Sequence, residues 1–446
     1  MKWFPEKLET FADRTAIIDK GCAYSYYDLH KRIKSYIDQL KSFTDVRLTV
    51  VLAGKYSFET IAAFFALFEL NQIISLFADN EKNELDLKLK ILEPDVVIEL
   101  LDTDLVISKR VSTQKYRLIE TLKSSGNSGL VLFTSGTTGE PKAILHNLDS
   151  LTEQYKRDYT KDLNIIPLLG FDHIGGLDMM LSQLAIGGTI TIPEKRTPKY
   201  ICETIEKHKV NVISASPTFL NLLLISEAYQ EYDLSSLKII GYGSEPMSEW
   251  LLEKLNMVFP RVSFQQKYGL SETNAVRIRS KSKNSLFFRI DDPTVDFRIV
   301  ENELWLKSPS VFAGYLAVKE NSDDDGWFRT GDIVESDIDG FIKILGRKSD
   351  IINVGGEKVF PAEIESVLFK VPFIRDCQVL AEKSLITGNM IVAKIVSDTD
   401  KTKPEQKQEI RKFLLSRLNR YKIPVKFCFV DSIDYNARMK KIRNIQ

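Results

Sequence analysis

The chain has 446 residues, more than a single hydrophobic core usually serves, so we expect a large domain and a smaller one. Its 61 acidic and 61 basic residues balance, which argues against a general nucleic-acid-binding protein because such proteins carry an excess of basic residues. The four cysteines and four histidines lack the spacing of a zinc site or a redox pair, and no apolar run reaches membrane-spanning length. With no export signal at the N-terminus, these features predict a cytoplasmic protein that binds neither nucleic acid nor membrane.

The first part of the chain alternates extended and helical patterns. A short extended segment, TAIID, precedes apolar residues at helical spacing in residues 27–40, and the strand pattern LTVVLAG precedes an amphipathic helix, FETIAAFFALFELN. The strand patterns ISLF and DVVIEL follow, with the helical pattern LDLKLKILE between them. Strands that alternate with helices predict an α/β domain whose largely parallel sheet is covered by helices on both faces.

A loop rich in glycine and hydroxyl groups comes next, at residues 131–143, VLFTSGTTGEPKA. An apolar run ending at Phe133 indicates a buried strand, and the six residues after it are only Thr, Ser and Gly. Glycines let backbone N–H groups approach a ligand, and hydroxyls and an ammonium can bind phosphate oxygens, so a phosphate-binding loop is predicted. The alternative is a polar hairpin, although an ordinary hairpin needs no hydroxyl cluster. The predicted phosphate-binding residues are Thr134, Ser135, Gly136, Thr137, Thr138, Gly139 and Lys142.

This loop resembles the signature [YF]-T-S-G-T-T-G-x-P-K-G of the acyl-adenylate-forming (AMP-binding) superfamily, which includes acyl- and aryl-CoA ligases, luciferases and peptide-synthetase adenylation domains. The sequence departs from the signature at Ala143, where glycine is usual, a minor change if the φ angle there is negative. The resemblance implies a large N-terminal α/β domain of layered sheets with a β subdomain, and a small mobile α+β C-terminal domain. It also implies ATP and Mg²⁺ as cofactors and CoA as the co-substrate.

Residues 165–188 resemble the segment that lines the acyl pocket in this superfamily. In acyl- and aryl-CoA ligases a helix there begins with an aromatic–His pair, whereas amino-acid adenylating domains have Phe–Asp. This sequence has Phe-Asp-His at 171–173, so both registers are possible. The spacing to the following Gly-Gly pair favours the CoA-ligase register, with His173 lining the pocket together with Leu270. Asp172 remains a possible partner for the ammonium group of an amino-acid substrate.

The segment GSEP, residues 243–246, resembles the superfamily loop whose backbone lies along the adenine. The resemblance implies that Gly243, Ser244 and Glu245 form a wall against the purine. The alternative for Glu245 is structural, because a carboxylate there could cap a helix that Pro246 begins.

The segment QQKYGLSET, residues 265–273, resembles the superfamily motif Y-G-x-T-E. An aromatic ring, a glycine turn, a hydroxyl and a carboxylate within five residues offer a stacking face, a phosphate donor and an oxygen ligand for a hard cation. The resemblance implies that Tyr268 stacks on adenine, that Gly269 makes the turn and that Ser271 contacts the α-phosphate. It also implies that Glu272 holds Mg²⁺.

Residues 286–345 contain short alternating segments and Asp-Gly pairs, which indicate an antiparallel β subdomain. Within WFRTGD, the resemblance implies that Asp332 binds both ribose hydroxyls, although a lone Asp beside Gly is otherwise a turn residue. In the following GRKSD segment, Arg347 matches a second ribose contact.

We expect the domain boundary at 345/346 and the small domain at residues 346–446, because the superfamily hinge corresponds to Ser349. Rotation at this hinge would bring Gly355 and Gly356 toward the thiol channel, where side chains would obstruct the pantetheine arm.

Near the end of the chain, IDYNARMKKIRN resembles the superfamily tail T-x-x-G-K-[IV]-x-R. This alignment makes Lys441 the catalytic lysine, with Lys440 as the alternative. The predicted function is an acid–thiol ligase in which a carboxylate attacks ATP to give acyl-AMP and CoA then takes the acyl group. Lys142, Lys441 and a Mg²⁺ ion held by Glu272 would supply the positioning and the charge neutralisation that this reaction needs. The alternatives are an enzyme that loads an amino or acyl acid onto a carrier protein, and a non-catalytic nucleotide or acyl-adenylate sensor.

Overall fold

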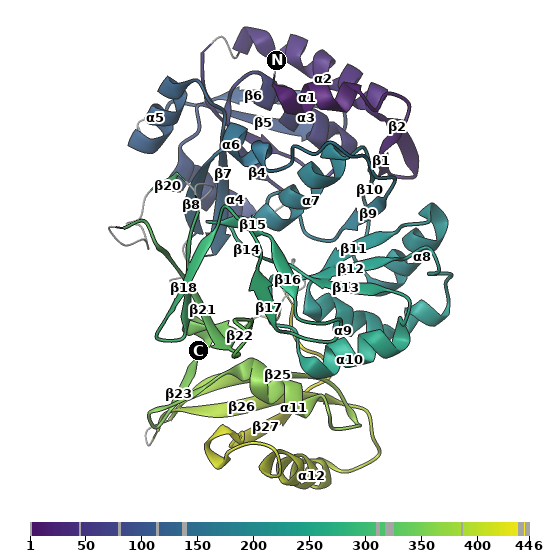
Figure 1. The fold of residues 1–446 in the computed structure, drawn as a ribbon, viewed down its shortest axis with the longest axis vertical. Coiled ribbons are helices and arrows are strands. Elements are labelled where there is room, and N and C mark those ends of the chain that lie inside the picture. The colour runs from purple at the N-terminus through teal and green to yellow at the C-terminus, as the bar shows by residue number, and fades with distance from the viewer. Residues whose placement is uncertain are drawn as a thin grey trace.

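The computed structural model describes residues 2–43, 46–78, 82–112, 116–135, 141–308, 313–316, 325–384 and 387–435, together with Lys441. Figure 1 shows a large upper body, formed by the purple to green part of the chain, and a smaller lower body formed by the yellow-green C-terminal part. None of the helices that the structure describes has both the length and the apolar character needed to span a lipid bilayer.

The first sheet of the large body has parallel central strands and antiparallel edges. Successive residues of its strands face opposite sides, as the period of a strand requires: Val50 packs against α2 and α3, whereas Val51 packs with residues of α4 and α5. The strands in sheet order are β20 (Gly314–Tyr315), β8 (Pro141–Asn147), β7 (Gly129–Ser135), β4 (Ile73–Phe77), β3 (Thr49–Ala53), β5 (Val96–Leu101) and β6 (Asp104–Lys109). The helices are α2 (Tyr26–Leu40), α3 (Phe58–Glu69), α4 (Lys82–Leu92) and α5 (Arg117–Ser125).

The second sheet is parallel except for its edge strand β2. One face shares a core with the first sheet through α2, α3 and α7, and the other face carries α8, α9 and α10. The strands in sheet order are β13 (Ser263–Gln266), β12 (Ile239–Tyr242), β11 (Val212–Ala215), β9 (Asn164–Pro167), β10 (Thr189–Thr191), β1 (Thr15–Asp19) and β2 (Cys22–Ser25). The helices near this sheet are α1 (Trp3–Glu9), α6 (Leu148–Glu153), α7 (Ile174–Ala185), α8 (Pro198–His208), α9 (Pro217–Ser226) and α10 (Glu249–Val258).

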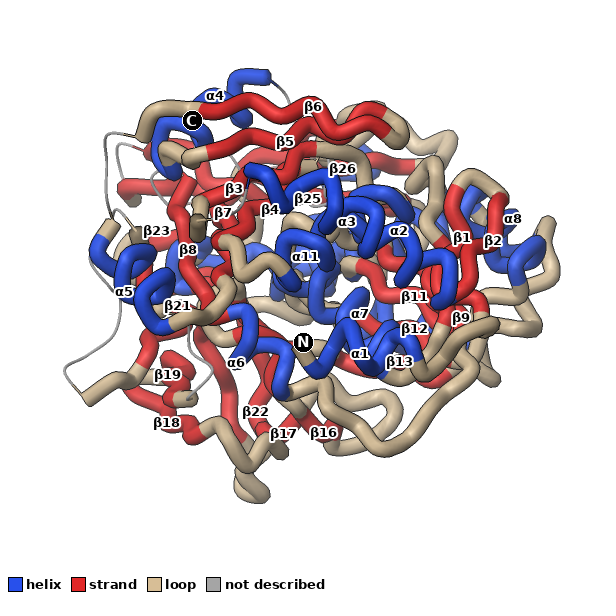
Figure 2. The backbone as a smooth tube through the Cα atoms, turned by 90° about the horizontal axis from the view of Figure 1, so that it is seen from above, coloured by secondary structure: helices blue, strands red, loops and turns tan. Residues whose placement is uncertain are grey.

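Helix α3 lies between the two sheets, which explains why nearly all of its residues are apolar and buried rather than only one stripe. Figure 2 shows α2 and α3 side by side. The predicted α/β class, with layered sheets and helices on both faces, is confirmed by this arrangement and by the similarity to solved structures described below.

An antiparallel sheet follows, as the alternating pattern predicted, but it is longer than expected at both ends. It begins at Ile278 rather than near residue 286, and its strand β22 continues through Arg347. The predicted domain boundary at 345/346 therefore falls inside β22, where Gly346 and Arg347 still pair with β21. The strands in sheet order are β16 (Ile278–Ser280), β17 (Phe288–Ile290), β22 (Ile342–Arg347), β21 (Phe328–Ser336), β19 (Glu303–Lys307) and β18 (Asp296–Val300).

The C-terminal part has a hydrophobic core of its own, whose buried members run from Ile352 to Ile423. Helix α12 begins after the capping residue Thr402 and ends at Leu415. The ring of Phe369 stacks on Trp250 of the large body with centroids 5.2 Å apart, so the two bodies touch at this point. The elements are β23 (Ile352–Val354), β24 (Glu357–Val359), α11 (Pro361–Leu368), β25 (Ile374–Ser384), β26 (Gly388–Ser397), α12 (Lys403–Leu415) and β27 (Lys426–Phe429).

Candidate active site

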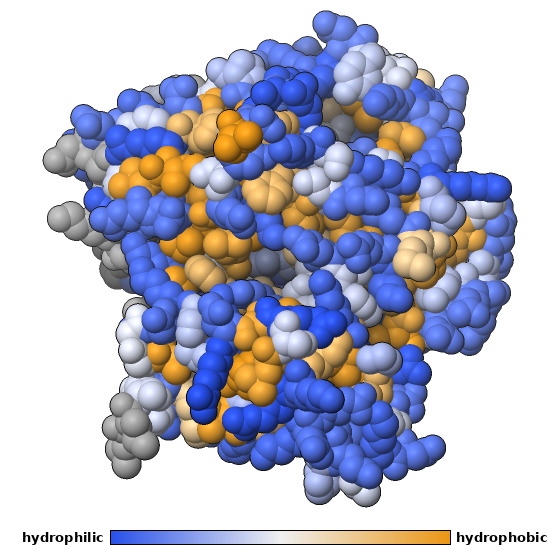
Figure 3. Space-filling model, turned by 60° about the horizontal axis from the view of Figure 1, so that its bottom comes forward, coloured by the Kyte–Doolittle hydropathy of each residue, from blue (hydrophilic) through white to orange (hydrophobic). Residues whose placement is uncertain are grey.

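A cavity of about 3210 Å³ lies where the large body, the antiparallel sheet and the C-terminal part meet. Seen with the C-terminal side forward, the surface is mostly hydrophilic, and apolar side chains gather around a hollow near its middle (Figure 3). The cavity brings together most of the residues singled out from the sequence. These are Thr134, Lys142, His173, Gly243, Ser244, Glu245, Tyr268, Gly269, Leu270, Ser271, Glu272, Asp332, Arg347, Ser349 and Lys441.

The predicted phosphate loop joins two antiparallel strands, β7 and β8, in which Thr134 pairs with Lys142 and Ser135 pairs with Pro141. In topology it is thus the hairpin that the sequence left as the alternative. The residues between the strands, Gly136, Thr137, Thr138 and Gly139 among them, lie outside the described part of the chain. Ala143 has no positive φ, so the alanine fits the backbone where the superfamily has glycine.

Glu272, the predicted magnesium ligand, is held by a tyrosine that the sequence reasoning missed. The hydroxyl of Tyr315 donates to Glu272 Oε1 at 2.7 Å, and Lys142 Nζ lies 5.6 Å from the centroid of the same ring. Tyr315 belongs to β20, which pairs with β8 and so stands beside the phosphate loop. The signal available in the sequence was the tyrosine itself, which follows Ala313 and Gly314.

The donor set at Glu272 fits a magnesium ion that is bound together with phosphate. Glu272 offers carboxylate oxygens to the cavity, and no group of three His, Cys, Asp or Glu side chains in the described residues is arranged to hold a metal by itself. Mg²⁺ commonly takes one or two carboxylates and completes its octahedron with phosphate oxygens and water. Lys142 lies on the same side of the cavity, so anionic phosphates would meet positive charge from its ammonium and from a magnesium ion held by Glu272.

His146 connects strand β8 to the segment that carries Glu272. It lies on β8, is 2% exposed, and shares a hydrogen bond with the backbone of Ser271. Burial lowers the pKa of His146 to about 4, and the bond to Ser271 only partly opposes that shift. The imidazole is therefore neutral at physiological pH and links the phosphate-loop strand to the Tyr268–Glu272 segment.

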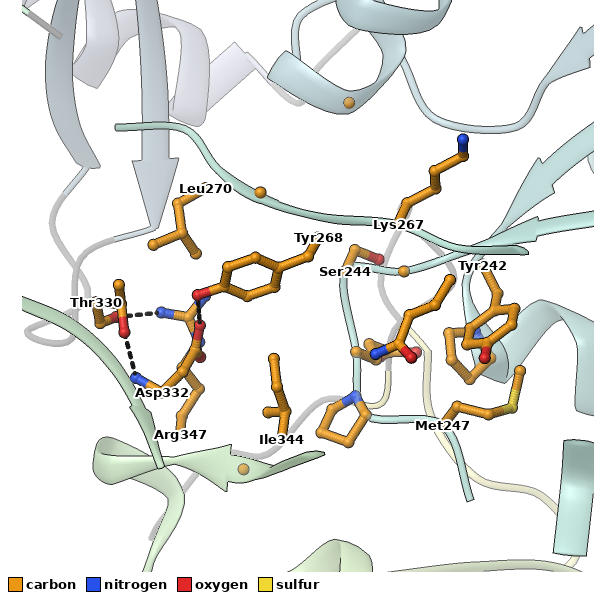
Figure 4. Close-up of a pocket in the computed structure, with 18 of the residues that line it drawn as sticks. Tyr242, Ser244, Met247, Lys267, Tyr268, Leu270, Thr330, Asp332, Ile344 and Arg347 are labelled. Carbon is orange, nitrogen blue, oxygen red and sulfur yellow. Dashed lines mark hydrogen bonds and ion pairs between the residues drawn. The ribbon is translucent and has the colours of Figure 1, made fainter. Parts of the chain in front are cut away.

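Asp332, Arg347 and Tyr268 form a connected corner of the cavity (Figure 4). Tyr268 donates its hydroxyl to Asp332 Oδ2 at 2.8 Å, and Arg347 Nε lies 2.8 Å from Asp332 Oδ1. Asp332 and Arg347 are paired residues of β21 and β22, and Arg347 also donates to the carbonyl of Thr330 at 2.9 Å. Burial raises the pKa of Asp332, while the adjacent guanidinium opposes that rise. This corner offers a diol a carboxylate acceptor already oriented by two neighbours.

In the segments predicted to bind adenine, Gly243 and Gly269 stand where a side chain would clash with the backbone of a neighbouring segment. A Cβ on Gly243 would lie 2.6 Å from the carbonyl oxygen of Lys267, and one on Gly269 would lie 2.3 Å from that of Asn274. Gly269 therefore does not make the predicted turn: it lies inside β14 (Tyr268–Leu270), which pairs with β15 (Asn274–Val276), and the turn comes at residues 271–273. Ser244 has a φ of 67°, in the left-handed region.

Glu245 caps a helix other than the one expected. No helix begins at Pro246; α10 begins at Glu249 and is capped by the side chain of Ser248. Glu245 Oε2 instead accepts the backbone N–H of Thr218 at 3.3 Å, in the first turn of α9, where a negative charge suits the helix N-terminus.

On the acyl side, His173 precedes α7 as its N-cap residue and lines the cavity. Asp172 is not among the lining residues: its carboxylate folds back over Gly170 and interacts with the charge of Arg196. Leu270 is 5% exposed and packs with Tyr315 and Phe328. Only His173 and Leu270 of these three predicted pocket residues therefore reach the cavity.

The predicted catalytic lysine is held within the C-terminal part. Lys441 Nζ forms an ion pair with Asp376 Oδ1 at 3.2 Å and donates to the carbonyl of Cys377, and its side chain is 8% exposed. Tyr435 donates to the other oxygen of Asp376. Lys440 lies outside the described residues. Lys441 thus borders the cavity while its charge is neutralised by Asp376.

Of the predicted hinge and thiol-channel residues, Ser349 lines the cavity and the two glycines do not. Ser349 is exposed in the short 3-10 turn Lys348–Asp350, directly after β22. Gly355 and Gly356 turn the β23–β24 hairpin with φ angles of 60° and 95° and do not line the cavity in this arrangement.

The chain is similar to known proteins over its whole length. A model of the AMP-binding enzyme family matches residues 4–316, and a model of the AMP-binding enzyme C-terminal domain matches residues 363–440. The 2-succinylbenzoate–CoA ligase of Bacillus licheniformis is 27% identical over 489 aligned positions, which cover 99% of this chain and 98% of that protein.

Solved structures show the same fold. An anthranilate CoA ligase in complex with anthranoyl-AMP has a TM-score of 0.81 at 18% identity, covering 98% of this chain and 95% of that chain. The o-succinylbenzoate–CoA synthetase of Bacillus subtilis in complex with ATP and magnesium ion has a TM-score of 0.75 at 22% identity, covering 99% and 98%.

Proposed function

This chain belongs to the AMP-binding enzyme family of adenylate-forming acid–thiol ligases, and from that premise we propose that it joins a small carboxylic acid to CoA through an acyl-adenylate. A carboxylate oxygen of the acid attacks the α-phosphorus of ATP, the bond to pyrophosphate breaks, and acyl-AMP forms. The CoA sulfur then attacks the acyl carbonyl, and AMP leaves. ATP, Mg²⁺ and CoA are the cofactors and co-substrate that this chemistry requires.

The observation that carries this proposal is the convergence of three groups on one cavity: Lys142, the Glu272–Tyr315 pair, and the Asp332–Arg347 pair. ATP and a carboxylate repel each other, so bringing them together demands positive charge and fixed geometry. We assign Lys142 to the β- and γ-phosphates and Asp332 with Arg347 to the ribose. Tyr268 and the Gly243–Glu245 segment are assigned to the adenine.

Glu272 would hold a magnesium ion, whose charge, when bound, would offset that of the α-phosphate. The chain's own contribution is to fix this carboxylate through the hydrogen bond from Tyr315. Ser271, whose backbone is tied to His146, would present its hydroxyl to the same phosphate.

The C-terminal part would act by moving. Lys441 cannot bridge the substrate carboxylate and the α-phosphate while it is paired with Asp376, so adenylation requires that this ion pair open. We place the pivot at Ser349 and begin the small domain after Arg347, because β22 ties everything up to Arg347 to the large body. We also propose a cytoplasmic location, where ATP and CoA are available together.

ATP–pyrophosphate exchange with a panel of acids, followed by measurement of CoA thiol consumption, tests this function. The panel contains 2-succinylbenzoate, anthranilate and 4-coumarate, which are the acids named by relatives of this chain, together with aliphatic mono- and dicarboxylic acids and amino acids. We expect acid-dependent exchange and, with the same acid, stoichiometric loss of free thiol. Exchange without thiol consumption would indicate transfer to a carrier protein instead, and the absence of exchange with every acid would exclude adenylation.

A further inference from the structure

Lys267 places a charged group in a part of the cavity that the nucleotide does not use. It joins β13 to β14, and its backbone N–H donates to the carbonyl of Tyr242 at 2.7 Å. Its methylene stem passes over β12, since a Cβ built on Gly241 would lie 3.6 Å from Lys267 Cε. Figure 4 shows the ammonium pointing away from Asp332 and Arg347.

Asp178 on α7 is close enough to feel the charge of Lys267, but the two groups do not form an ion pair. The charge of Lys267 influences the pKa of Asp178, which burial raises, so the two side chains face the same space. Asp178 Oδ1 accepts the hydroxyl of Tyr155 at 2.8 Å. Within the described chain, Lys267 Nζ has no carboxylate oxygen within 4.0 Å, and its side chain is exposed to the cavity.

Apolar residues of β9, β11 and α7 line the same cavity, among them Ile165, Val212, Ile174 and Met179. An ammonium inside a cavity attracts an opposite charge more strongly than one in bulk water, because the attraction is screened less there. An unpaired ammonium in this position therefore favours an anionic group on whatever molecule fills the pocket.

We propose that the acid ligated by this enzyme carries a second anionic group, most simply a second carboxylate, and that Lys267 binds it. The proposal rests on the ligase function given above and adds the substrate class to it. One carboxylate is activated beside Ser271 and Glu272, while the other is held at the opposite end of the acyl pocket.

The separation of the two sites limits the length of the acid. Lys267 precedes Ser271 by four residues, which corresponds to roughly 13 Å of extended chain at about 3.3 Å per residue. Both carboxylates of one molecule can be served only if several bonds separate them. Aryl diacids with an alkanoate side chain and medium-length aliphatic diacids meet this requirement, whereas a diacid with its carboxylates on one carbon does not.

The opposite assignment, in which Asp178 binds the ammonium of an amino acid, is weaker. One of its oxygens already accepts the phenol of Tyr155, and burial favours its protonated form. The Lys267 ammonium has no carboxylate oxygen within 4.0 Å in the described chain, so it is the better placed of these two groups to bind a charged substituent of the acid.

Two matched pairs of acids test the proposal by ATP–pyrophosphate exchange. The first pair is heptanoate and pimelate, and the second is 4-phenylbutyrate and 4-(2-carboxyphenyl)butyrate. For the wild-type protein we expect kcat/KM to be about 10- to 100-fold higher for the diacid of a pair, the range of one charge-assisted hydrogen bond. Lys267→Met keeps the length of the side chain and removes its charge. It should abolish the preference by raising KM for the diacid, with kcat little changed.

Two control variants separate charge from shape. Lys267→Arg keeps the charge and should retain the diacid preference, and Asp178→Asn removes the neighbouring negative charge and should retain or increase it. Equal use of both acids by the wild-type protein, or an unchanged preference in Lys267→Met, would overturn the proposal while leaving the ligase function intact. A lack of exchange with every acid would instead overturn the ligase function itself.

Discussion

In the large body, residues assigned to the nucleotide already contact one another, whereas the predicted catalytic lysine is paired with a carboxylate of the C-terminal part. Asp332 is oriented by Arg347 and Tyr268, and Glu272 by Tyr315. Lys441 is instead neutralised by Asp376. The difference indicates that nucleotide binding needs little rearrangement, while the acid-activation step requires a buried ion pair to open.

The largest effect is expected from removing the ammonium group of Lys441. Lys441→Ala should lower the rate of acyl-AMP formation by at least about 100-fold, because it removes the positive charge that joins carboxylate and α-phosphate in the transition state. Thioester formation from supplied acyl-AMP should be nearly unchanged. Single-turnover assays of each half-reaction measure both rates, with Lys440→Ala as the matched control. Persistent adenylation in Lys441→Ala, with loss in Lys440→Ala, would assign the role to the neighbouring lysine.

The free energy of unfolding of the protein should depend on pH through His146. Its folded-state pKa of about 4 lies below the ordinary value of 6.5, so the unfolded chain binds the proton more tightly. The stability that this neutral side chain contributes is present above pH 6.5 and is lost as the pH falls to about 4, up to about 3 kcal/mol at 1.36 kcal/mol per pKa unit. Urea unfolding at several pH values measures this slope, which His146→Gln should flatten. An equal slope in both proteins would contradict the assignment.

A change at the ribose corner should weaken nucleotide binding without abolishing the chemistry. Asp332→Asn leaves the Arg347 guanidinium without its buried carboxylate partner and weakens the acceptor for the diol, so we expect kcat/KM for ATP to fall by about 10- to 100-fold. Tyr268→Phe removes only the phenol that donates to Asp332 and should cost less. Steady-state exchange at varied ATP concentration gives both values. A larger loss in Tyr268→Phe would mean that the phenol, rather than the carboxylate, dominates this corner.

The smallest effect is expected from changing Asp376, the carboxylate that is paired with Lys441. Asp376→Asn weakens the resting ion pair of Lys441, which should shift the population toward the arrangement competent for adenylation and raise the rate of that half-reaction by about three- to tenfold. Tyr435→Phe, which removes another contact of Asp376 but leaves its charge, is the control. A slower adenylation in Asp376→Asn, with stability unchanged, would show that Asp376 helps the lysine act rather than holding it back.

The sequence predicted those features that depend on local pattern. The alternation of strands and helices and the order of the motifs are both visible in short segments. The contacts between distant segments were not predicted. Tyr315 reaches Glu272 across 43 residues, and the Lys441–Asp376 pair joins the end of the chain to β25, because packing rather than local pattern brings these residues together.

Two errors have the same origin. Asp172 was a candidate for the pocket because of its place next to His173, but the backbone turns it over Gly170, toward Arg196. The boundary at 345/346 followed the start of a motif, whereas the pairing of Arg347 with Asp332 carries the sheet past that point. Sequence position alone does not show which way a side chain points or where a strand stops pairing.

The extension of β22 past the expected boundary affects what happens to the intermediate. Arg347 is the last residue of the strand and Ser349 lies in the next turn. The ribose would therefore stay bound to the large body while the C-terminal part rotates. An acyl-AMP made in the first step would then remain anchored through its ribose during the exchange of lysine for thiol. Leakage of this hydrolysis-prone anhydride into water would be limited without any lid dedicated to that purpose.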